Sequence, residues 1–303
     1  MTFSDARFDL RETLGAAVVA RDVVEVGGPD ATSYLQGQLS QNVEGLDVGA
    51  TAWSFVLQPA GKVDAWCRIT RREDDRYLID LDAGAGDRLV ARLRRFLLRT
   101  KAEVEPQAGW GCIALRGPGA GTAAEEIAAD AELLVPAGWP GVEGADLLGP
   151  HVEPPSGTGL VAATMTDYHA LRIRSGVPAM GAELTERTIP AEVGQWLVDR
   201  SVDFTKGCFT GQELVARIDS RGGNVPRHLR GLLVADPAVP PAGATVHVDG
   251  ADVGTTTSSA SAAGVGFPVA LAYVTRAVEP PADAVVSWPD GDLPATIHTL
   301  PLG

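Results

Sequence analysis

The sequence contains few cysteines, no paired histidines, no excess of basic residues and no long apolar run, and each absence excludes a class of function. Its three cysteines, Cys67, Cys112 and Cys208, lie far apart and form no CxxC pair. This pattern fits neither a disulfide framework nor a structural zinc site. The five histidines have no paired ligand spacing, so we expect no metal held by protein side chains. At least one cysteine is then a candidate for a free functional thiol.

Basic charge is scarce, with 25 Lys and Arg against 39 Asp and Glu and a formal net charge of −14. Proteins that bind nucleic acids or anionic membranes normally carry the opposite excess, so we expect no direct DNA binding and no membrane partner. No stretch approaches the ~20 apolar residues of a membrane span. The opening MTFSDARFDLRETLGAAVVARD lacks a basic segment followed by an apolar run, which predicts a cytoplasmic protein.

The composition is that of a globular α+β protein with more than one lobe. Apolar residues make up 45% of 303 positions, more chain than one hydrophobic core usually serves. Residues 23–39 (VVEVGGPDATSYLQGQL) are typical of a strand, a Gly-Gly-Pro turn and a helix whose first residue is Pro29. Residues 112–130 (CIALRGPGAGTAAEEIAAD) repeat this order. We expect both strand–helix units in one α+β lobe.

Between these units, residues 53–82 predict strands joined by a Pro-Ala-Gly turn and by the charged turn RREDD. Residues 87–100 (DRLVARLRRFLLRT) predict an amphipathic helix with an apolar face of leucines and Phe96. A second face carries an arginine stripe, namely Arg88, Arg92, Arg95 and Arg99. Two interpretations of the stripe stay open: a solvated face that keeps the helix soluble, and a docking surface for an anionic partner.

The pattern changes twice in the second half of the chain. Residues 130–160 are rich in Gly and Pro, which predicts short strands and loops. Beyond residue 226, short β-branched runs alternate with turn residues, which predicts a small antiparallel β-barrel or sandwich. We therefore divide the chain into an α+β region of two lobes, residues 1–226, and a C-terminal β-domain, residues 227–303.

The segment KGCFTGQE, residues 206–213, places a thiol between a lysine and two glycines. It is not a phosphate loop, because Lys206 precedes the glycines instead of following them. Thr210 and Glu213 have the spacing of a capping box, which predicts a helix start just after Cys208. The helix dipole and Lys206 would both favour the thiolate, and Gly207 and Gly211 would allow positive φ angles. The alternative is an inert thiol packed beneath a turn.

This segment resembles a known family. KGCFTGQE matches the K-G-C-[YF]-x-G-Q-E signature of the YgfZ-type folate-binding proteins, relatives of the glycine-cleavage T-protein (aminomethyltransferase) that act in maturation or repair of iron-sulfur proteins. VGGPDATSYLQGQLSQNV, LQPAGKVDAW and LRIRSGVPAMGAELTERTIPAEV are similar to further family segments. The resemblance implies a T-protein-like fold of three lobes around a central folate channel, with a terminal barrel, and tetrahydrofolate or a derivative as cofactor.

The resemblance also implies site residues, with two departures from the T-protein pattern. The T-proteins have paired aspartates after the glycine turn, and here Asp64 or Trp66 takes the place of the one beside folate, depending on where the glycine is aligned. Arg174 stands where T-proteins have a glutamate for the pterin amines, and arginine cannot accept those hydrogen bonds. The remaining candidates for cofactor binding are listed here: Gly207, Gln212, Glu213, Arg217 and Arg227.

The leading function implied by the resemblance is a folate-binding accessory factor for iron-sulfur proteins, among them tRNA-modifying enzymes, with Cys208 and Lys206 as the reactive pair. Its partners would be folate and iron-sulfur client proteins or assembly factors. The alternative is a tetrahydrofolate-dependent aminomethyltransferase of a glycine-cleavage system. A third hypothesis, a thiol oxidoreductase, lacks a second cysteine near Cys208 in sequence.

Overall fold

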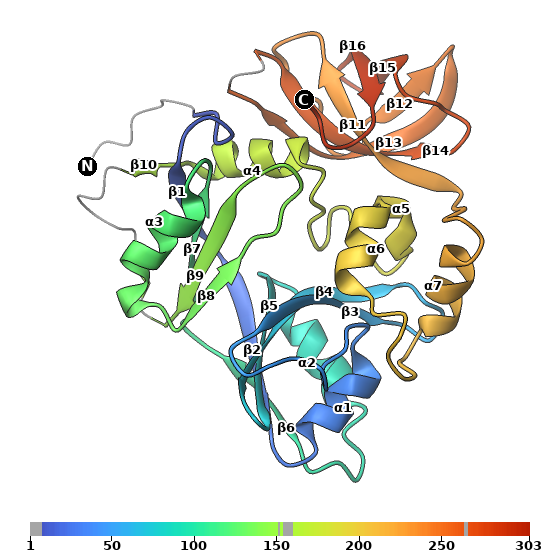
Figure 1. Cartoon of the computed structure of the whole chain (residues 1–303). Coiled ribbons are helices and arrows are strands. Elements are labelled where there is room, and N and C mark those ends of the chain that lie inside the picture. The colour runs from blue at the N-terminus through green and yellow to red at the C-terminus, as the bar shows by residue number, and fades with distance from the viewer. Residues whose placement is uncertain (1–7, 151, 154–159, 264–265) are drawn as a thin grey trace. The chain divides into compact units, whose positions relative to one another are not determined.

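The structure is a computed structural model that describes residues 8–150, 152–153, 160–263 and 266–303 (Figure 1). The chain divides into two compact units, each assembled from separate stretches. Unit 1 contains the stretch that ends at Val19, together with Gly111–Pro178 and Arg227–Gly303. Unit 2 contains Ala20–Trp110 and Ala179–Pro226. The two strand–helix units at residues 23–39 and 112–130 therefore lie in different compact units, so the expectation that they share one lobe is wrong.

Unit 2 is built on a five-stranded antiparallel sheet of order β3-β4-β5-β2-β6. Its strands are β2 (Arg21–Gly27), β3 (Thr51–Leu57), β4 (Val63–Glu73), β5 (Arg76–Asp82) and β6 (Glu103–Gln107). Helices α1 (Ala31–Gln38) and α2 (Gly86–Arg94) contribute Leu35, Leu89 and Leu93 to the same apolar core as the strands. The unit is completed by α5 (Pro190–Val193), α6 (Gln195–Ser201) and α7 (Gln212–Asp219).

Unit 1 combines a small sheet with a closed barrel. The sheet has the order β10-β1-β7-β9-β8, with strands β1 (Gly15–Val19), β7 (Gly111–Arg116), β8 (Leu133–Pro136), β9 (Gly144–Gly149) and β10 (Val161–Ala162). Its helices are α3 (Ala120–Ile127), the short 3-10 helix η1 (Ala128–Asp130) and α4 (Met165–Arg174). Part of the Gly/Pro-rich stretch, residues 151 and 154–159, lies outside the described residues.

The C-terminal barrel closes in the order β11-β14-β13-β12-β15-β16, with all neighbours antiparallel. Its strands are β11 (Arg227–Val234), β12 (Thr245–Val248), β13 (Ala251–Ser261), β14 (Pro268–Thr275), β15 (Ala282–Trp288) and β16 (Gly291–His298). Small and branched side chains fill its interior, among them Leu232, Ala270 and Val286. The prediction of an α+β protein that ends in an antiparallel barrel is confirmed.

Two helix boundaries differ from the predictions. Helix α1 begins at Ala31 with Asp30 as its N-cap, so Pro29 precedes the helix instead of opening it. Helix α2 ends at Arg94, six residues before the predicted end at Thr100. The chain must leave the helix there, because the backbone N–H of Lys101 donates to the Asp30 carboxylate at 2.7 Å and β6 begins two residues later. A helix continued to residue 100 would place Lys101 elsewhere.

Candidate functional site

The loop that carries Cys208 connects α6 to α7 and is held by its own polar groups. One oxygen of Asp203 accepts from the Thr205 hydroxyl at 2.6 Å, from the Thr205 N–H at 2.7 Å and from the Lys206 N–H at 3.1 Å. The Thr205 hydroxyl and these two amides hold the pKa of Asp203 below its usual value. The Asp203 N–H donates in turn to the Ser40 carbonyl at 3.0 Å. The loop therefore starts from a fixed turn.

Lys206 fastens the loop to the C-terminal end of α1. Its Nζ donates to the carbonyls of Gln36 and Leu39, both at 2.6 Å, and of Gln41 at 2.9 Å. Carbonyls at the end of a helix lack partners within the helix, and a lysine ammonium has three N–H groups to offer. Burial lowers the pKa of Lys206 to about 8. All three N–H groups are directed at the C-terminal end of α1 and the residues just after it, so Lys206 positions the loop.

Cys208 is exposed, whereas Cys67 and Cys112 are both buried. Burial, together with the charge of Asp80, raises the pKa of Cys67 to about 12, which keeps that thiol protonated and unreactive. Cys67 donates weakly to the Ser54 carbonyl inside the sheet, with a sulfur–oxygen distance of 3.7 Å. Of the three thiols, the one in the signature segment is thus the one that a reagent or partner reaches.

The predicted capping box is wrong. Helix α7 has Gly211 as its N-cap, at φ 82°, and no side chain caps it. The Thr210 N–H donates to the Gly37 carbonyl, and the Gln212 side chain accepts from the Phe209 N–H at 3.0 Å. A glycine is needed here because a Cβ on Gly211 would lie 2.7 Å from the Leu57 Cβ.

Gly61, in the turn between β3 and β4, has a matching requirement, since a Cβ there would lie 2.5 Å from the Leu214 Cβ. The start of α7 thus packs closely on the β3–β4 turn through two glycines. Gly207, by contrast, lies in open space and has no positive φ, so the conformational role expected for it is wrong.

Asp64, on β4, is gripped by two arginines of α2. Its Oδ1 lies 3.0 Å from an Arg88 terminal nitrogen, and its Oδ2 lies 3.2 Å from the Arg92 Nε. Arg92 also donates to the Gln38 side-chain oxygen at 3.0 Å and to the Leu57 carbonyl at 3.2 Å. Arg88 and Arg92, the first two residues of the predicted arginine stripe, therefore point toward the sheet of unit 2. Both oxygens of Asp64 are engaged, and the side chain is 14% exposed.

Trp66 is a packing residue inside unit 2. Its ring stacks on Trp53 with centroids 4.0 Å apart and meets the edge of Trp196 at 6.5 Å. Its Nε1 donates to the Ser201 hydroxyl at 3.0 Å, and 4% of the residue is exposed. Because Trp53 covers a face of the ring, that face is closed to a stacked ligand.

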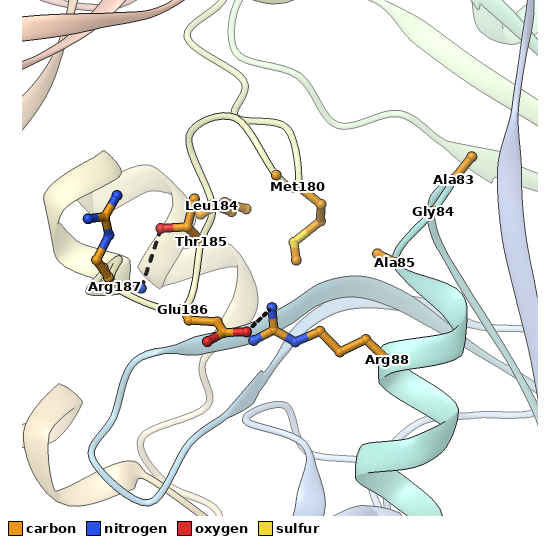
Figure 2. Close-up of a pocket in the computed structure, with 10 residues that line it drawn as sticks. Ala83, Gly84, Ala85, Arg88, Met180, Leu184, Thr185, Glu186 and Arg187 are labelled. Atoms are coloured by element: carbon orange, nitrogen blue, oxygen red, sulfur yellow. Dashed lines mark hydrogen bonds and ion pairs between the residues drawn. The ribbon is translucent and has the colours of Figure 1, made fainter. Parts of the chain in front are cut away.

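A cavity of about 610 Å³ lies within unit 2, between the start of α2 and the segment before α5 (Figure 2). Its apolar wall includes Met180 and Leu184. Its polar wall consists of Arg88, Thr185, Glu186 and Arg187. Arg88 bridges two carboxylates, since its guanidinium contacts Asp64 as well as Glu186, which lies 2.9 Å away. Asp64 thus stands behind the arginine that lines the cavity.

The cavity residues between Met180 and Arg187 were missed by reasoning from sequence. They fall in a quoted family segment, but no motif there marks an individual side chain. The charged run ELTER could have marked this segment as a polar surface. Its place in a cavity wall depends on the ion pair between Glu186 and Arg88, which lie nearly a hundred positions apart in sequence.

The candidate residues divide between the two units. Unit 2 contains the following: Asp64, Trp66, Lys206, Gly207, Cys208, Gln212, Glu213 and Arg217. Within it, Glu213 and Arg217 are exposed on α7. Arg174 and Arg227 belong to unit 1.

The two arginines of unit 1 have contacts of their own. Arg174 is buried and donates to both oxygens of Asp9, at 2.8 and 2.9 Å. The guanidinium of Arg227 lies over the Tyr273 ring at 4.1 Å, at the start of the barrel. Arg174 is therefore engaged in an ion pair within unit 1.

No helix in the described part of the chain is both long enough and apolar enough to cross a membrane. No three His, Cys, Asp or Glu side chains of the described residues gather as ligands for a metal ion.

Two family models match the chain. The GCVT N-terminal domain matches residues 18–136, and the glycine cleavage T-protein C-terminal barrel domain matches residues 227–302. A crystal structure of the glycine cleavage system aminomethyltransferase T from Bartonella henselae superposes with a TM-score of 0.77 at 19% identity, over 97% of this chain and 87% of that one. The fold is that of the T-protein.

Three curated relatives show how the similarity is distributed. The tRNA-modifying protein YgfZ of Edwardsiella ictaluri is 29% identical over 66% of this chain and 65% of its own length. An iron-sulfur cluster assembly factor IBA57 homolog of Cryptococcus neoformans is 30% identical over 71% of this chain and 64% of its own. An aminomethyltransferase of Streptomyces avermitilis is 27% identical over 87% of this chain and 78% of its own. The chain thus spans just under two thirds of the first two relatives.

Proposed function

Because the chain is a YgfZ-type protein of the glycine-cleavage T-protein family, we propose that it is a cytoplasmic, folate-binding accessory factor in maturation or repair of iron-sulfur proteins, and that it depends on Cys208. The observation that carries this proposal is the exposure of Cys208 on a loop that Asp203 and Lys206 hold in place. A thiolate binds iron and attacks sulfur. A relative named as an iron-sulfur cluster assembly factor and another named as a tRNA-modifying protein support a role of this class, and we include tRNA-modifying enzymes among the proposed clients.

The loop presents its thiol to a partner protein. Asp203 and Lys206 fix the backbone just before Cys208, so that the thiol stays at the surface without an ordering cost when a client binds. The neighbouring Phe209 is buried and lies 5.1 Å from the Lys206 ammonium, which anchors the other side of the thiol. Such a thiol suits contact with a large partner better than chemistry inside a closed cavity.

The folate partner fits the cavity in unit 2. A volume of about 610 Å³ lies in the range typical of small-molecule sites. Glu186 would accept hydrogen bonds from the pterin amine groups, while Arg187 would pair with the glutamate carboxylate of the folate tail. Met180 and Leu184 offer an apolar wall for the rings. Tetrahydrofolate, when bound, supplies a carrier for one-carbon units.

Calorimetry tests the folate part of the proposal. We expect tetrahydrofolate or its formyl or methyl derivative to bind the folded protein, and Glu186→Gln to weaken binding roughly tenfold through loss of a charge-assisted hydrogen bond. Arg200→Glu, an exposed change elsewhere in unit 2, is the control and should bind as the wild type does. Absence of binding at millimolar folate would remove this part of the proposal.

Complementation tests the thiol part. In a strain deleted for this chain, the wild type should restore the activity of an iron-sulfur client enzyme and Cys208→Ala should not. Removing an exposed thiol at the surface leaves folding intact, so loss of rescue would report function. Equal rescue by Cys208→Ala would overturn the mechanism.

An aminomethyltransferase is the second candidate, because the relative with that name matches 87% of this chain. Proton transfer in that reaction needs a carboxylate placed to exchange a proton with the amine. Both oxygens of Asp64 are instead engaged by Arg88 and Arg92, which favours the accessory factor. Turnover in a glycine-cleavage assay, with the other components of the system supplied, would decide for the second candidate.

A thiol oxidoreductase has less support in unit 2. Cys67 is fully buried there and its pKa is raised to about 12, so it does not suit the role of a resolving thiol for Cys208.

A further inference from the structure

The segment after α2 exposes basic and apolar side chains together. Residues Arg95–Lys101, here called the basic turn, read RFLLRTK and contain no acidic residue, in a chain whose net charge is −14. Arg95, Arg99 and Lys101 are exposed. Within the part of the chain that the structure describes, none of these three side chains forms an ion pair. This local excess of positive charge contrasts with the rest of the sequence.

The backbone of the basic turn places apolar side chains in solvent. After α2 ends, the Phe96 N–H donates to the Leu93 carbonyl at 2.9 Å, and the Thr100 N–H donates to the Leu97 carbonyl at 3.0 Å. Arg99 adopts a left-handed conformation at φ 61°, which is uncommon for a residue other than glycine and is often found at functional sites. Leu98 is 86% exposed and Phe96 41%.

The basic turn and the Cys208 loop are tied to opposite ends of one short helix. The Lys101 N–H bonds to Asp30, the N-cap of α1, whereas Lys206 bonds to the Leu39 carbonyl at the C-terminal end of α1. A helix of this length spans about 12 Å. A standard protein interface covers about 800 Å² of each partner, a patch roughly 30 Å across. One partner can therefore cover both features.

We propose that the basic turn is the docking surface for the client protein, and that the client contacts it through an acidic patch with an exposed apolar side chain. This rests on the proposed function, which requires a client to reach Cys208. Opposite charge steers the encounter, and Leu98 provides an apolar contact that excludes water. Arg92 keeps its guanidinium 4.1 Å over the Phe96 ring and so stiffens this edge of the surface.

A protein partner fits the surface better than a nucleic acid does. The basic turn is short, and β6 follows it with the exposed residues Glu103 and Glu105. A phosphate backbone continues beyond any short patch and would run onto such carboxylates. A compact acidic patch on a folded protein can instead match the turn alone.

Charge reversal tests the surface. We expect Arg95→Glu/Arg99→Glu to reduce rescue of the iron-sulfur client roughly tenfold or more, because like charges now face each other. Arg95→Lys/Arg99→Lys should retain rescue. Arg200→Glu/Arg221→Glu, the matched control with two exposed arginines elsewhere in unit 2, changes net charge equally and should also retain it. Full rescue by Arg95→Glu/Arg99→Glu would overturn the docking surface.

Two measurements separate this result from failure of the proposed function. In Arg95→Glu/Arg99→Glu, folate binding by calorimetry and the alkylation rate of Cys208 should stay at wild-type values. If rescue is lost and either folate binding or Cys208 alkylation falls as well, the defect lies in the fold or the folate site, and this would contradict docking. If Cys208→Ala also gives full rescue, the proposed function itself has failed.

Two labelled probes identify the class of partner by fluorescence anisotropy at about 50 and about 200 mM salt. One is an amphipathic helical peptide of about 20 residues, with Glu on one face and Leu on the opposite face. The other is a single-stranded RNA of similar length. We expect the peptide to bind more tightly. Arg95→Glu/Arg99→Glu, or Gln in place of Glu in the peptide, should weaken that binding at least roughly tenfold. Tighter binding of the RNA, or no binding of the peptide by the wild type, would overturn an acidic protein partner.

Discussion

Within unit 2, two aspartates and two cysteines can be compared, because in each case one side chain is enclosed by protein and the other is more accessible to solvent. Asp80 and Asp64 are both gripped by two arginines, yet Asp80 is 1% exposed and Asp64 14%. Cys67 is buried in the sheet and Cys208 is exposed on a loop. The side-chain type is the same within each pair. Its surroundings decide whether it supports the fold or serves a partner.

The enclosed carboxylate is part of the sheet itself. Arg68 on β4 lies directly opposite Asp80 on β5, and its Nη2 is 2.6 Å from the Asp80 Oδ1. Arg21 of β2 approaches the same oxygen at 2.7 Å. The two arginines outweigh the effect of burial and hold the pKa of Asp80 below its usual value. The Asp64 pair forms instead beside a cavity.

The largest effect is expected from breaking the enclosed pair. Asp80→Asn leaves two arginines near a neutral group in the core, and it should lower the free energy of unfolding by about 3 to 5 kcal/mol. Urea denaturation monitored by tryptophan fluorescence measures it. A loss below about 1 kcal/mol would show that burial does not distinguish Asp80 from Asp64.

The interaction of Asp80 with its two arginines should also appear in the pH dependence of the free energy of unfolding. Since the pKa of Asp80 is lower in the folded protein, folding favours the ionised form. The resulting stability is fully present above the unfolded value of about 3.9 and is lost as pH falls through the lower folded value. Denaturation curves of the wild type from about pH 6 downward should therefore lose stability mainly below about pH 4. Asp80→Asn should flatten that dependence, and an unchanged slope would contradict the assignment.

Lys206→Met is expected to have an intermediate effect, because it keeps the apolar stem and removes the three hydrogen bonds to the end of α1 and the residues just after it. We expect a loss of about 1 to 3 kcal/mol and faster amide exchange of Phe209 and Thr210. The alkylation rate of Cys208 should change through loop motion. If exchange in the loop stays at the wild-type rate, Lys206 does not anchor it.

A smaller change in stability is expected for the half-buried carboxylate, Asp64. Asp64→Asn should cost about 1 kcal/mol or less, since Arg88 keeps Glu186 and Arg92 keeps the oxygens of Gln38 and Leu57. Folate affinity should nonetheless change, because Arg88 lines the cavity. Calorimetry measures it, with Arg200→Glu as the control. A stability loss equal to that of Asp80→Asn would erase the contrast between the two carboxylates.

The sequence predicted features that depend on local pattern. The β-branched runs of the barrel and the strands of residues 53–82 follow from spacing and turn residues. The family resemblance pointed to the T-protein fold. These features require no knowledge of distant contacts.

Features that depend on tertiary contacts were predicted wrongly or missed. Phe96 and Leu97 fit a helical period, but the chain leaves α2 to bring Lys101 to Asp30. Thr210 has capping-box spacing, but the approach of Gly211 to the β3–β4 turn decides the cap. No spacing rule places Arg88 beside Asp64, because 24 positions separate them and the contact joins α2 to β4.

Alkylation of the native protein tests the central claim most directly. The claim is that the signature loop presents the one reactive thiol of the chain, with Cys67 and Cys112 enclosed. Iodoacetamide should modify Cys208 at least roughly a hundredfold faster than either other cysteine near pH 7, because the thiolate must be both formed and reached. Mass spectrometry of the peptides resolves the three rates. Modification of Cys67 or Cys112 at a rate equal to or above that of Cys208 would contradict the account.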